Sequence, residues 1–447
     1  MTDLRLGRGF LAGSVHAPHG FVMSRHPDRE QLPAVDAAWL RMDSPTNAMV
    51  INALLMFREA PAFERVKALV EERLLAHRRF LQRVVEPALG HPYWELDPHF
   101  HVGAHLHRIG LGSPGDQAAL ETLLSDLAST KLDRDKPLWQ SHFIEGVGPG
   151  AALFTRLHHS MGDGVSLVRF LLGLTDEGAV LSPPEVGVEA PHPEKLAERA
   201  KVAAAQALTL GRLLLLPPDS ATPLKGELCT DKRVAWSSPT PLEQVKALAH
   251  QHGAKVNDVL VAALTGALAR YVERQVPLPG LNLRALVPVY VREPGAGDDL
   301  GNHFGLVYVP LPIGIDDRFA RLRTLRESFE QIKRDPDAVV ALGVLGAMGV
   351  TSSEIEHIGI ELFTRKATVM VTNVPGPPVE IHLAGKPLSE MLVWAPVSGH
   401  IGVGLTLLSY AGQVRLGVAA DALRVPEPRA LVRAYEEELA ALISTAS

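Results

Sequence analysis

Two adjacent histidines stand in a short segment that could carry out acid–base chemistry. The segment His158-His159-Ser160-Met161-Gly162-Asp163-Gly164 follows a largely apolar run over 151–157 and precedes apolar residues at helical spacing over 165–172. Histidine gains and loses a proton near neutral pH, as a general base must. Neighbouring residues on a strand point to opposite faces, so only one of the two rings can face a given cavity. We expect the other ring to be structural.

The second half of the segment indicates a tight strand-to-helix turn. Asp163 lies four residues after His159 and between two glycines, where crowding of the backbone favours small residues. An aspartate there is more useful as an anchor paired with an arginine than as a second base, and Gly164 lets the backbone turn without a Cβ clash. The alternative is a chance pair of surface histidines in a loop, because the chain contains 19 histidines.

Periodic apolar patterns predict helices and strands on both sides of this turn. Seven prolines between 176 and 225 indicate a linker that contains one apolar helix. After the linker, Thr240-Pro241-Leu242-Glu243 resembles a capping box before a helix that ends near Gly253, and Asn257 can cap the next helix. Further helices are expected at 66–74, 120–127, 322–332 and 431–443, and strands at 283–291, 304–311, 367–372, 401–408 and 413–420.

The order of these elements predicts an α/β (α+β) fold with two lobes. The N-terminal lobe is expected over 1–175, the interdomain linker over 176–230 and the C-terminal lobe over 231–447.

Composition excludes several classes of protein. With 46% hydrophobic and 21% charged residues the chain is typical of a globular protein, and its net charge of −6 argues against nucleic acid as a partner. A single cysteine, Cys229, excludes an internal disulfide and a thiolate metal cage, and it fits a reducing compartment. The histidines at 99, 101, 105 and 107 lack an acidic partner at ligand spacing, so we expect no metal.

Membrane-spanning and targeting segments are not expected. The chain begins without the apolar core of a signal peptide, and no stretch offers the ~20 apolar residues that a spanning helix needs. The most membrane-like piece is Ala203 to Pro218, where the apolar block Leu213 to Leu216 stands beside Arg212. This piece could lie on a bilayer surface, or it could be a linker helix packed on a lobe.

Several motifs together resemble a known family. The pattern HHxxxDG marks the coenzyme A-dependent acyltransferase superfamily, which includes chloramphenicol acetyltransferase, carnitine acyltransferases and peptide-synthetase condensation domains. Three further blocks resemble the bacterial wax ester synthase / diacylglycerol acyltransferase family, in the same order along the chain: Asp133-Arg134-Asp135-Lys136-Pro137-Leu138-Trp139, Val256-Asn257-Asp258-Val259 and Thr372-Asn373-Val374-Pro375-Gly376-Pro377. The resemblance runs from about Asp36 to Pro426 and is poorest over the linker.

This resemblance implies a fold and a reaction. The fold would be two chloramphenicol-acetyltransferase-like lobes, each a mixed sheet flanked by helices, with a tunnel between them. The reaction would be an O-acyl transfer from acyl-CoA to diacylglycerol or a long-chain alcohol, which makes triacylglycerol or wax ester. His159 would be the general base, and no acyl-enzyme and no cofactor would be needed, because acyl-CoA is itself the co-substrate. The protein would be cytoplasmic and peripheral at the inner face of a membrane or at lipid droplets.

The resemblance also suggests roles for other residues. His158 would be structural, and Asp163 would pair with Arg292, which could instead be a solvated arginine at the end of a strand. Asn257 could orient substrate or stabilise the oxyanion, or it could only cap its helix. Asp258 would be a first-turn acid favoured by the helix dipole.

Trp139, Thr372 and Asn373 complete the expected substrate-binding set, although a tryptophan packs more often than it takes part in chemistry.

Two other functions share these motifs. A condensation-type acyltransferase would use a carrier-protein thioester or an amine acceptor, but this sequence carries no carrier domain. A non-catalytic lipid-binding relative would keep the fold without the reaction, and the intact His159-Asp163-Gly164 pattern argues against it.

Overall fold

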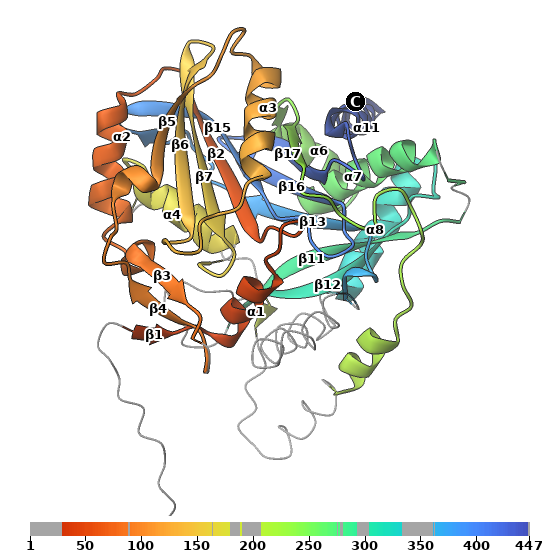
Figure 1. Ribbon diagram of the computed structural model, residues 1–447. Helices are drawn as coiled ribbons and strands as arrows, with labels where there is room; N and C mark the ends of the chain where they lie inside the picture. Colours follow the sequence, from red (N-terminus) through yellow and green to blue (C-terminus); the bar gives the residue numbers. More distant parts are fainter. Residues whose placement is uncertain are drawn as a thin grey trace, which may run out of the picture.

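Two large sheets, one associated with each half of the chain, organise the molecule (Figure 1). The computed structural model describes residues 29–87, 90–162, 164–178, 188–189, 207–274, 276–277, 280–292, 304–332, 361 and 363–445. These residues confirm the predicted fold of two sheet-rich α/β lobes.

The N-terminal sheet has six strands in the order β14-β15-β2-β7-β6-β5. The strands are β2 (Val50–Phe57), β5 (Leu106–Gly110), β6 (Trp139–Val147), β7 (Gly150–His158), β14 (His382–Leu383) and β15 (Lys386–Trp394). All neighbours are antiparallel except β5 and β6. Every residue of β7 is buried, because β7 is central and both faces of the sheet are covered.

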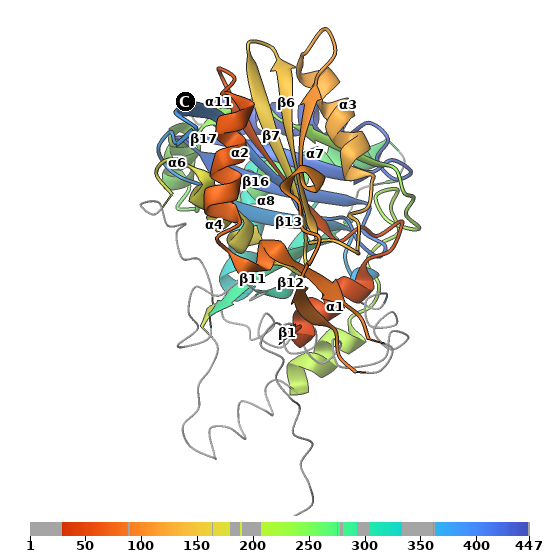
Figure 2. The same ribbon diagram turned by 60° about the vertical axis from the view of Figure 1, so that its left-hand side comes forward.

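Helices cover the two faces of this sheet separately, and Figure 2 shows α3 on one side of β7 and β6 and α2 with α4 on the other. The helices are α1 (Ala34–Met42), α2 (Phe63–Leu69), α3 (Gln117–Ala128) and α4 (Gly164–Leu174). A π-helical turn, Val70–Leu74, extends α2, and a short 3₁₀ turn, Arg78–Leu81, follows it. A small sheet of β1 (Arg29–Gln31), β4 (Tyr93–Leu96) and β3 (Gln82–Val85) lies beside this lobe.

The C-terminal sheet follows the order β10-β17-β16-β13-β11-β12, and β9 and β8 pair with β17 and β11 at its sides. Its strands are β8 (Val188–Glu189), β9 (Lys232–Trp236), β10 (Thr240–Pro241), β11 (Leu283–Arg292), β12 (Phe304–Leu311), β13 (Val369–Pro375), β16 (Val403–Tyr410) and β17 (Gln413–Asp421). Its helices are α6 (Leu242–Gln251), α7 (Val256–Glu273), α8 (Arg318–Ile332) and α11 (Pro428–Thr445). The helix α7 is buried on most of its surface and forms the centre of this core.

The sheets do not follow the predicted division of the chain into 1–175 and 231–447. The strands β14 and β15 come from the C-terminal half, yet β15 pairs with β2 in the N-terminal sheet. The run from Met391 to Trp394 is apolar on both faces, and it is buried there because it joins the sheet between two covering layers. The lobes are therefore joined by an exchanged strand as well as by the linker.

Most of the predicted elements are present, and two helix starts differ. The strands over 283–291 and 304–311 and the helix ending near Gly253 are confirmed. Thr240 and Pro241 are not a capping box, because they pair with β17 as β10 and Pro241 itself precedes the helix. Asn257 is not the cap of α7, because the helix begins at Val256 and Lys255 is the residue before it.

The helix predicted inside the linker is present over 207–215. In the described part of the chain, no helix combines the length and the apolar character needed to cross a membrane.

Candidate active site

The histidine pair lies at the end of β7, next to the boundary between the lobes. His158 is the last residue of β7 and pairs with Val50 of β2. Its backbone N–H donates to the Leu138 carbonyl at 3.0 Å, and the N–H of His159 donates to the Met49 carbonyl at 2.7 Å. The backbone of the pair is therefore held on two sides, by the Pro-Leu-Trp segment and by the segment that leads into β2.

The ring of His159 forms a cluster with one aromatic side chain from each lobe. It stacks on Trp39 of α1, with ring centroids 4.2 Å apart and planes 17° apart, and it lies 5.5 Å from Phe304 at the start of β12. Only 7% of His159 is exposed. The ring therefore lies against aromatic side chains at the junction of the lobes and does not face bulk solvent.

The ring of His158 is turned into the N-terminal lobe. Its Nδ1 accepts the backbone N–H of Ser160 at 3.1 Å and lies 2.8 Å from the Ser160 hydroxyl, and its Nε2 is 4.0 Å from the Asp43 carboxylate. Burial lowers the pKa of His158 to about 3, against the opposing effect of Asp43. A ring with this pKa is neutral at physiological pH, so His158 contributes contacts rather than a titrating group.

An arginine and an aspartate that were not identified as functional residues from the sequence support this arrangement. The Asp43 carboxylate accepts the Met49 N–H at 3.1 Å and pairs with Arg134 at 3.2 Å. Arg134 also donates to the Leu40 carbonyl at 2.6 Å. The available signal was the position of Arg134 just before Pro-Leu-Trp, since this block adjoins the histidine strand.

Trp139 lies in the core of the N-terminal lobe. It is fully buried, its indole N–H donates to the Phe80 carbonyl at 2.9 Å, and it stacks on His105 with centroids 4.7 Å apart. Trp139 therefore has no exposed surface to offer to a substrate. It packs in the core, which is the more common role of a tryptophan noted from the sequence.

The structure brings together two asparagines from separate motifs. The side-chain amide of Asn373 in β13 donates to the side-chain oxygen (Oδ1) of Asn257 at the start of α7, at 3.1 Å. Asp258 is buried, and its carboxylate accepts the Lys255 N–H at 2.8 Å, so it caps the helix. Thr372 is half-buried beside Thr406 of β16. The two asparagine amides form a hydrogen-bonded pair in which Asn257 is half-buried and Asn373 is exposed.

Some predicted contacts fall outside the described residues. Asp163 is not among the described residues, and neither the surroundings of Gly164, at the start of α4, nor the side chain of Arg292, at the end of β11, is described. The Asp163–Arg292 pair and the tunnel between the lobes therefore stay predictions. Within the described residues, no group of three histidine, cysteine, aspartate or glutamate side chains could hold a metal ion.

The two-lobed α/β fold, with adjacent histidines at the end of a buried strand, is the arrangement expected for the acyltransferase superfamily that the sequence resembles. The comparisons with known proteins name the family. The wax ester synthase/diacylglycerol acyltransferase catalytic domain matches residues 32–212, and the WS/DGAT C-terminal domain matches residues 300–443. The chain belongs to the wax ester synthase/diacylglycerol acyltransferase family.

Related proteins and solved structures cover nearly the whole chain. A Mycobacterium tuberculosis protein named as a probable diacylglycerol O-acyltransferase is 27% identical over 92% of this chain and 96% of its own length. The structure of the wax ester synthase/diacylglycerol acyltransferase from Marinobacter aquaeolei VT8 has a TM-score of 0.69 and 25% identity, covering 93% of this chain and 99% of that one. The starter condensation domain of rhizomide synthetase, at 14% identity and a TM-score of 0.61, covers 94% of this chain and 95% of its own and shares the fold.

Proposed function

We propose that this protein transfers a fatty acyl group from acyl-CoA to the hydroxyl of diacylglycerol or a long-chain alcohol, with His159 as the general base. The role of His159 rests on the difference between the surroundings of its ring and those of the His158 ring. His159 stacks on Trp39 and lies near Phe304 at the junction of the lobes, whereas His158 is buried within one lobe with its Nδ1 occupied by Ser160. The position of His159 at the junction of the lobes supports it, rather than His158, as the base for a substrate held between the lobes.

The proposed reaction needs one base and an environment poor in water. The imidazole removes the hydroxyl proton as the alcohol oxygen attacks the thioester carbonyl, because an alcohol is a weak nucleophile while it keeps that proton. The tetrahedral intermediate collapses and releases the CoA thiolate, which takes the proton back from His159. The apolar surroundings of His159 favour transfer over hydrolysis, because water would compete as acceptor. Acyl-CoA serves as co-substrate, and the scheme uses no cofactor.

The test replaces His159 with alanine. Thioester release from palmitoyl-CoA would be followed with dioleoylglycerol, with hexadecanol and with a fatty amine as acceptors. We expect His159→Ala to lose about 10²- to 10⁴-fold in turnover while it still folds and unfolds cooperatively, at a lower melting temperature because a buried ring is removed. His99→Ala, at an exposed histidine, is the matched control and should keep full activity.

Near-wild-type turnover by folded His159→Ala would exclude the mechanism. A clear preference for the amine would instead favour the condensation-type reaction, and binding of lipid without any transfer would favour a non-catalytic relative.

We also propose that the protein works at the cytoplasmic surface of a membrane or lipid droplet, through the helix over 207–215. Leu208 is 78% exposed and Leu215 is 85% exposed, whereas Leu213 on the other side of the helix is buried. Lys366 donates to the carbonyls of Leu213 and Leu214 and so holds the end of this helix against the C-terminal lobe. A helix that is anchored on one side and presents leucines on the other is suited to the surface in which the lipid acceptors dissolve.

Flotation with phosphatidylcholine vesicles that contain diacylglycerol tests this surface. We expect Leu208→Ser/Leu215→Ser to bind less than the wild type and to keep its thermal stability. Leu423→Ser is the matched control, since Leu423 is also an exposed leucine but lies after β17. Equal binding by all three proteins would contradict the proposed surface.

A further inference from the structure

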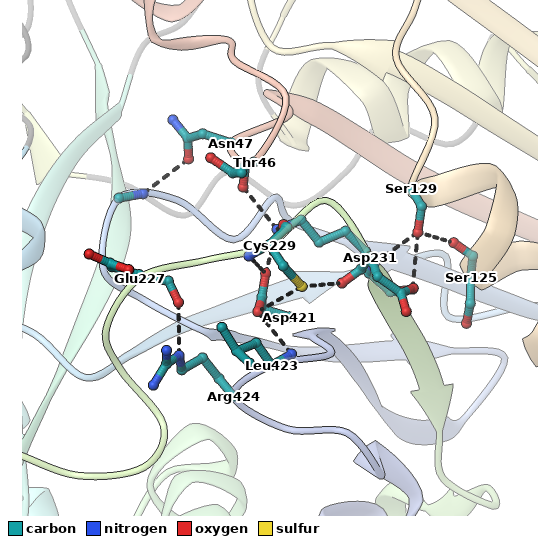
Figure 3. A network of polar contacts seen from close by, with 12 residues as sticks. Thr46, Asn47, Ser125, Ser129, Glu227, Cys229, Asp231, Asp421, Leu423 and Arg424 are labelled. Atoms are coloured by element: carbon teal, nitrogen blue, oxygen red, sulfur yellow. Dashed lines mark hydrogen bonds and ion pairs between the residues drawn. The ribbon is translucent and has the colours of Figure 1, made fainter.

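A buried lysine links the C-terminal lobe to the loop that holds the histidine pair. Lys232 begins β9, and its side chain is 9% exposed. Its ammonium lies 2.8 Å from the Asp421 carboxylate, 2.8 Å from the Cys229 carbonyl and 2.9 Å from the Thr46 carbonyl. A lysine ammonium has three hydrogens to donate, and each has one oxygen here. Figure 3 shows Thr46, Cys229 and Asp421 converging on this point from different segments of the chain.

The Asp421 carboxylate is fixed independently of the lysine. It is completely buried at the end of β17, and it accepts the backbone N–H of Cys229 at 2.9 Å and of Leu423 at 3.1 Å. The carboxylate therefore provides a fixed negative charge that directs the ammonium of Lys232. The remaining hydrogen bond of Lys232 reaches across to Thr46 in the N-terminal lobe.

Thr46 belongs to the loop over 43–49, between α1 and β2, which contacts both histidines. At one end of the loop, Asp43 accepts the Met49 N–H and faces the Nε2 of His158. At the other end, the Met49 carbonyl accepts the N–H of His159. The loop thus supplies one of the contacts that hold the backbone of His159.

The loop has a second attachment to the C-terminal half. The N–H of Gly399 donates to the Asn47 side-chain oxygen at 3.0 Å, and the Asn47 amide donates to the Met42 carbonyl at 2.8 Å. Two hydrogen bonds from distant parts of the chain, one from Lys232 and one from Gly399, therefore hold the same short loop.

We propose that Lys232 is a positioning residue for acyl transfer: by holding the Thr46 carbonyl it fixes the 43–49 loop, and through Met49 it fixes the backbone of His159. This inference rests on the proposed role of His159 as base. A base that is displaced by a fraction of an ångström from its reacting proton loses much of its effect, so a contact remote from the reaction can govern turnover.

The test must separate positioning from stability, because Lys232→Met leaves the buried Asp421 charge without its partner and lowers the stability of the protein. The variant Lys232→Met/Asp421→Asn removes both charges. We expect its melting temperature to lie between those of Lys232→Met and the wild type. Its kcat should stay as low as that of Lys232→Met, about 10-fold below the wild type, because neither variant can hold Thr46. The KM for palmitoyl-CoA should not change.

Two further variants complete the experiment. Arg233→Met is the matched control, since Arg233 follows Lys232 but forms a half-exposed pair with Asp231, and it should keep the wild-type kcat. Asn47→Ala removes the other attachment of the loop without touching a charge and should lower kcat in the same way. Amide hydrogen exchange over 43–51 should be faster in Lys232→Met/Asp421→Asn and in Asn47→Ala than in the wild type.

A double variant whose kcat recovers together with its melting temperature would overturn the proposal, because Lys232 would then serve stability alone. Failure of the proposed function looks different, since His159→Ala would then stay active whatever the Lys232 variants do.

Discussion

Replacing His158 with asparagine should make the folded protein less sensitive to acid. The Nδ1 atom of His158 accepts the Ser160 N–H, and the side-chain oxygen of asparagine can take over that hydrogen bond. Asparagine does not titrate, whereas burial holds the pKa of His158 at about 3 in the folded protein. The variant therefore keeps a local contact and removes a proton-binding group.

The magnitude follows from the difference between the folded and unfolded pKa. The unfolded histidine titrates near its ordinary pKa of about 6.5, so below that pH the unfolded chain binds a proton that the folded protein refuses. The stability associated with neutral His158 is present above about pH 6.5 and is lost as the pH falls. Between about pH 7.5 and about pH 5 the loss from this one residue is about 2 kcal/mol in the free energy of unfolding.

Urea unfolding at the two pH values measures this loss. We expect the wild type to lose about 2 kcal/mol more than His158→Asn between them. His142, whose pKa burial lowers to about 4, contributes equally to both proteins and cancels from the comparison. His99→Asn, at an exposed position, should lose as much stability as the wild type. Identical losses in the wild type and His158→Asn would refute the assignment of His158 as a buried neutral ring.

Three further substitutions test the surroundings of the site. Arg134→Gln should lower kcat about 10-fold with little change in the KM for acyl-CoA, as steady-state kinetics would show, because it releases the 43–49 loop. Gly150→Ala should lower the free energy of unfolding by about 3 kcal/mol in urea titrations, because the new Cβ would lie 1.9 Å from the Phe57 carbonyl oxygen. Unchanged stability would contradict the packing of β7 against β2. Asn373→Ala should lower kcat/KM for the lipid alcohol about fivefold. The melting temperature should not change, since the amide pair that the substitution breaks lies at the surface. Wild-type kinetics would show that the pair is not part of the substrate site.

Local patterns were sufficient to predict the elements around the histidines. The apolar run before His158 and the helical spacing after Gly164 correspond to β7 and α4, because burial on both faces of a strand and on one face of a helix each leave a repeat in the sequence. The strand β15 could not be placed in this way. Its partner β2 lies more than 300 residues earlier, and no local pattern reports on pairing between segments so far apart.

The start of α7 was misplaced for a related reason. Asn257 is a common capping residue, and its type outweighed its position in the prediction. In the folded protein the Asp258 carboxylate accepts the backbone N–H of Lys255, while the Asn257 side chain contacts Asn373 in β13. The tertiary contact of Asn257 competes with its local preference.

The sequence by itself determined which chemical groups are available and in what order: an imidazole pair at a strand end, followed by a turn and a helix, within a series of motifs that identify the family. Only the tertiary structure decided which ring faces the other lobe. His158 and His159 have the same side chain, and they differ because Trp39 and Phe304 cover one of them while Ser160 and Asp43 surround the other. These neighbours come from α1, β12, the 43–49 loop and the turn after β7, and the environment of a side chain is set by the elements that pack around it.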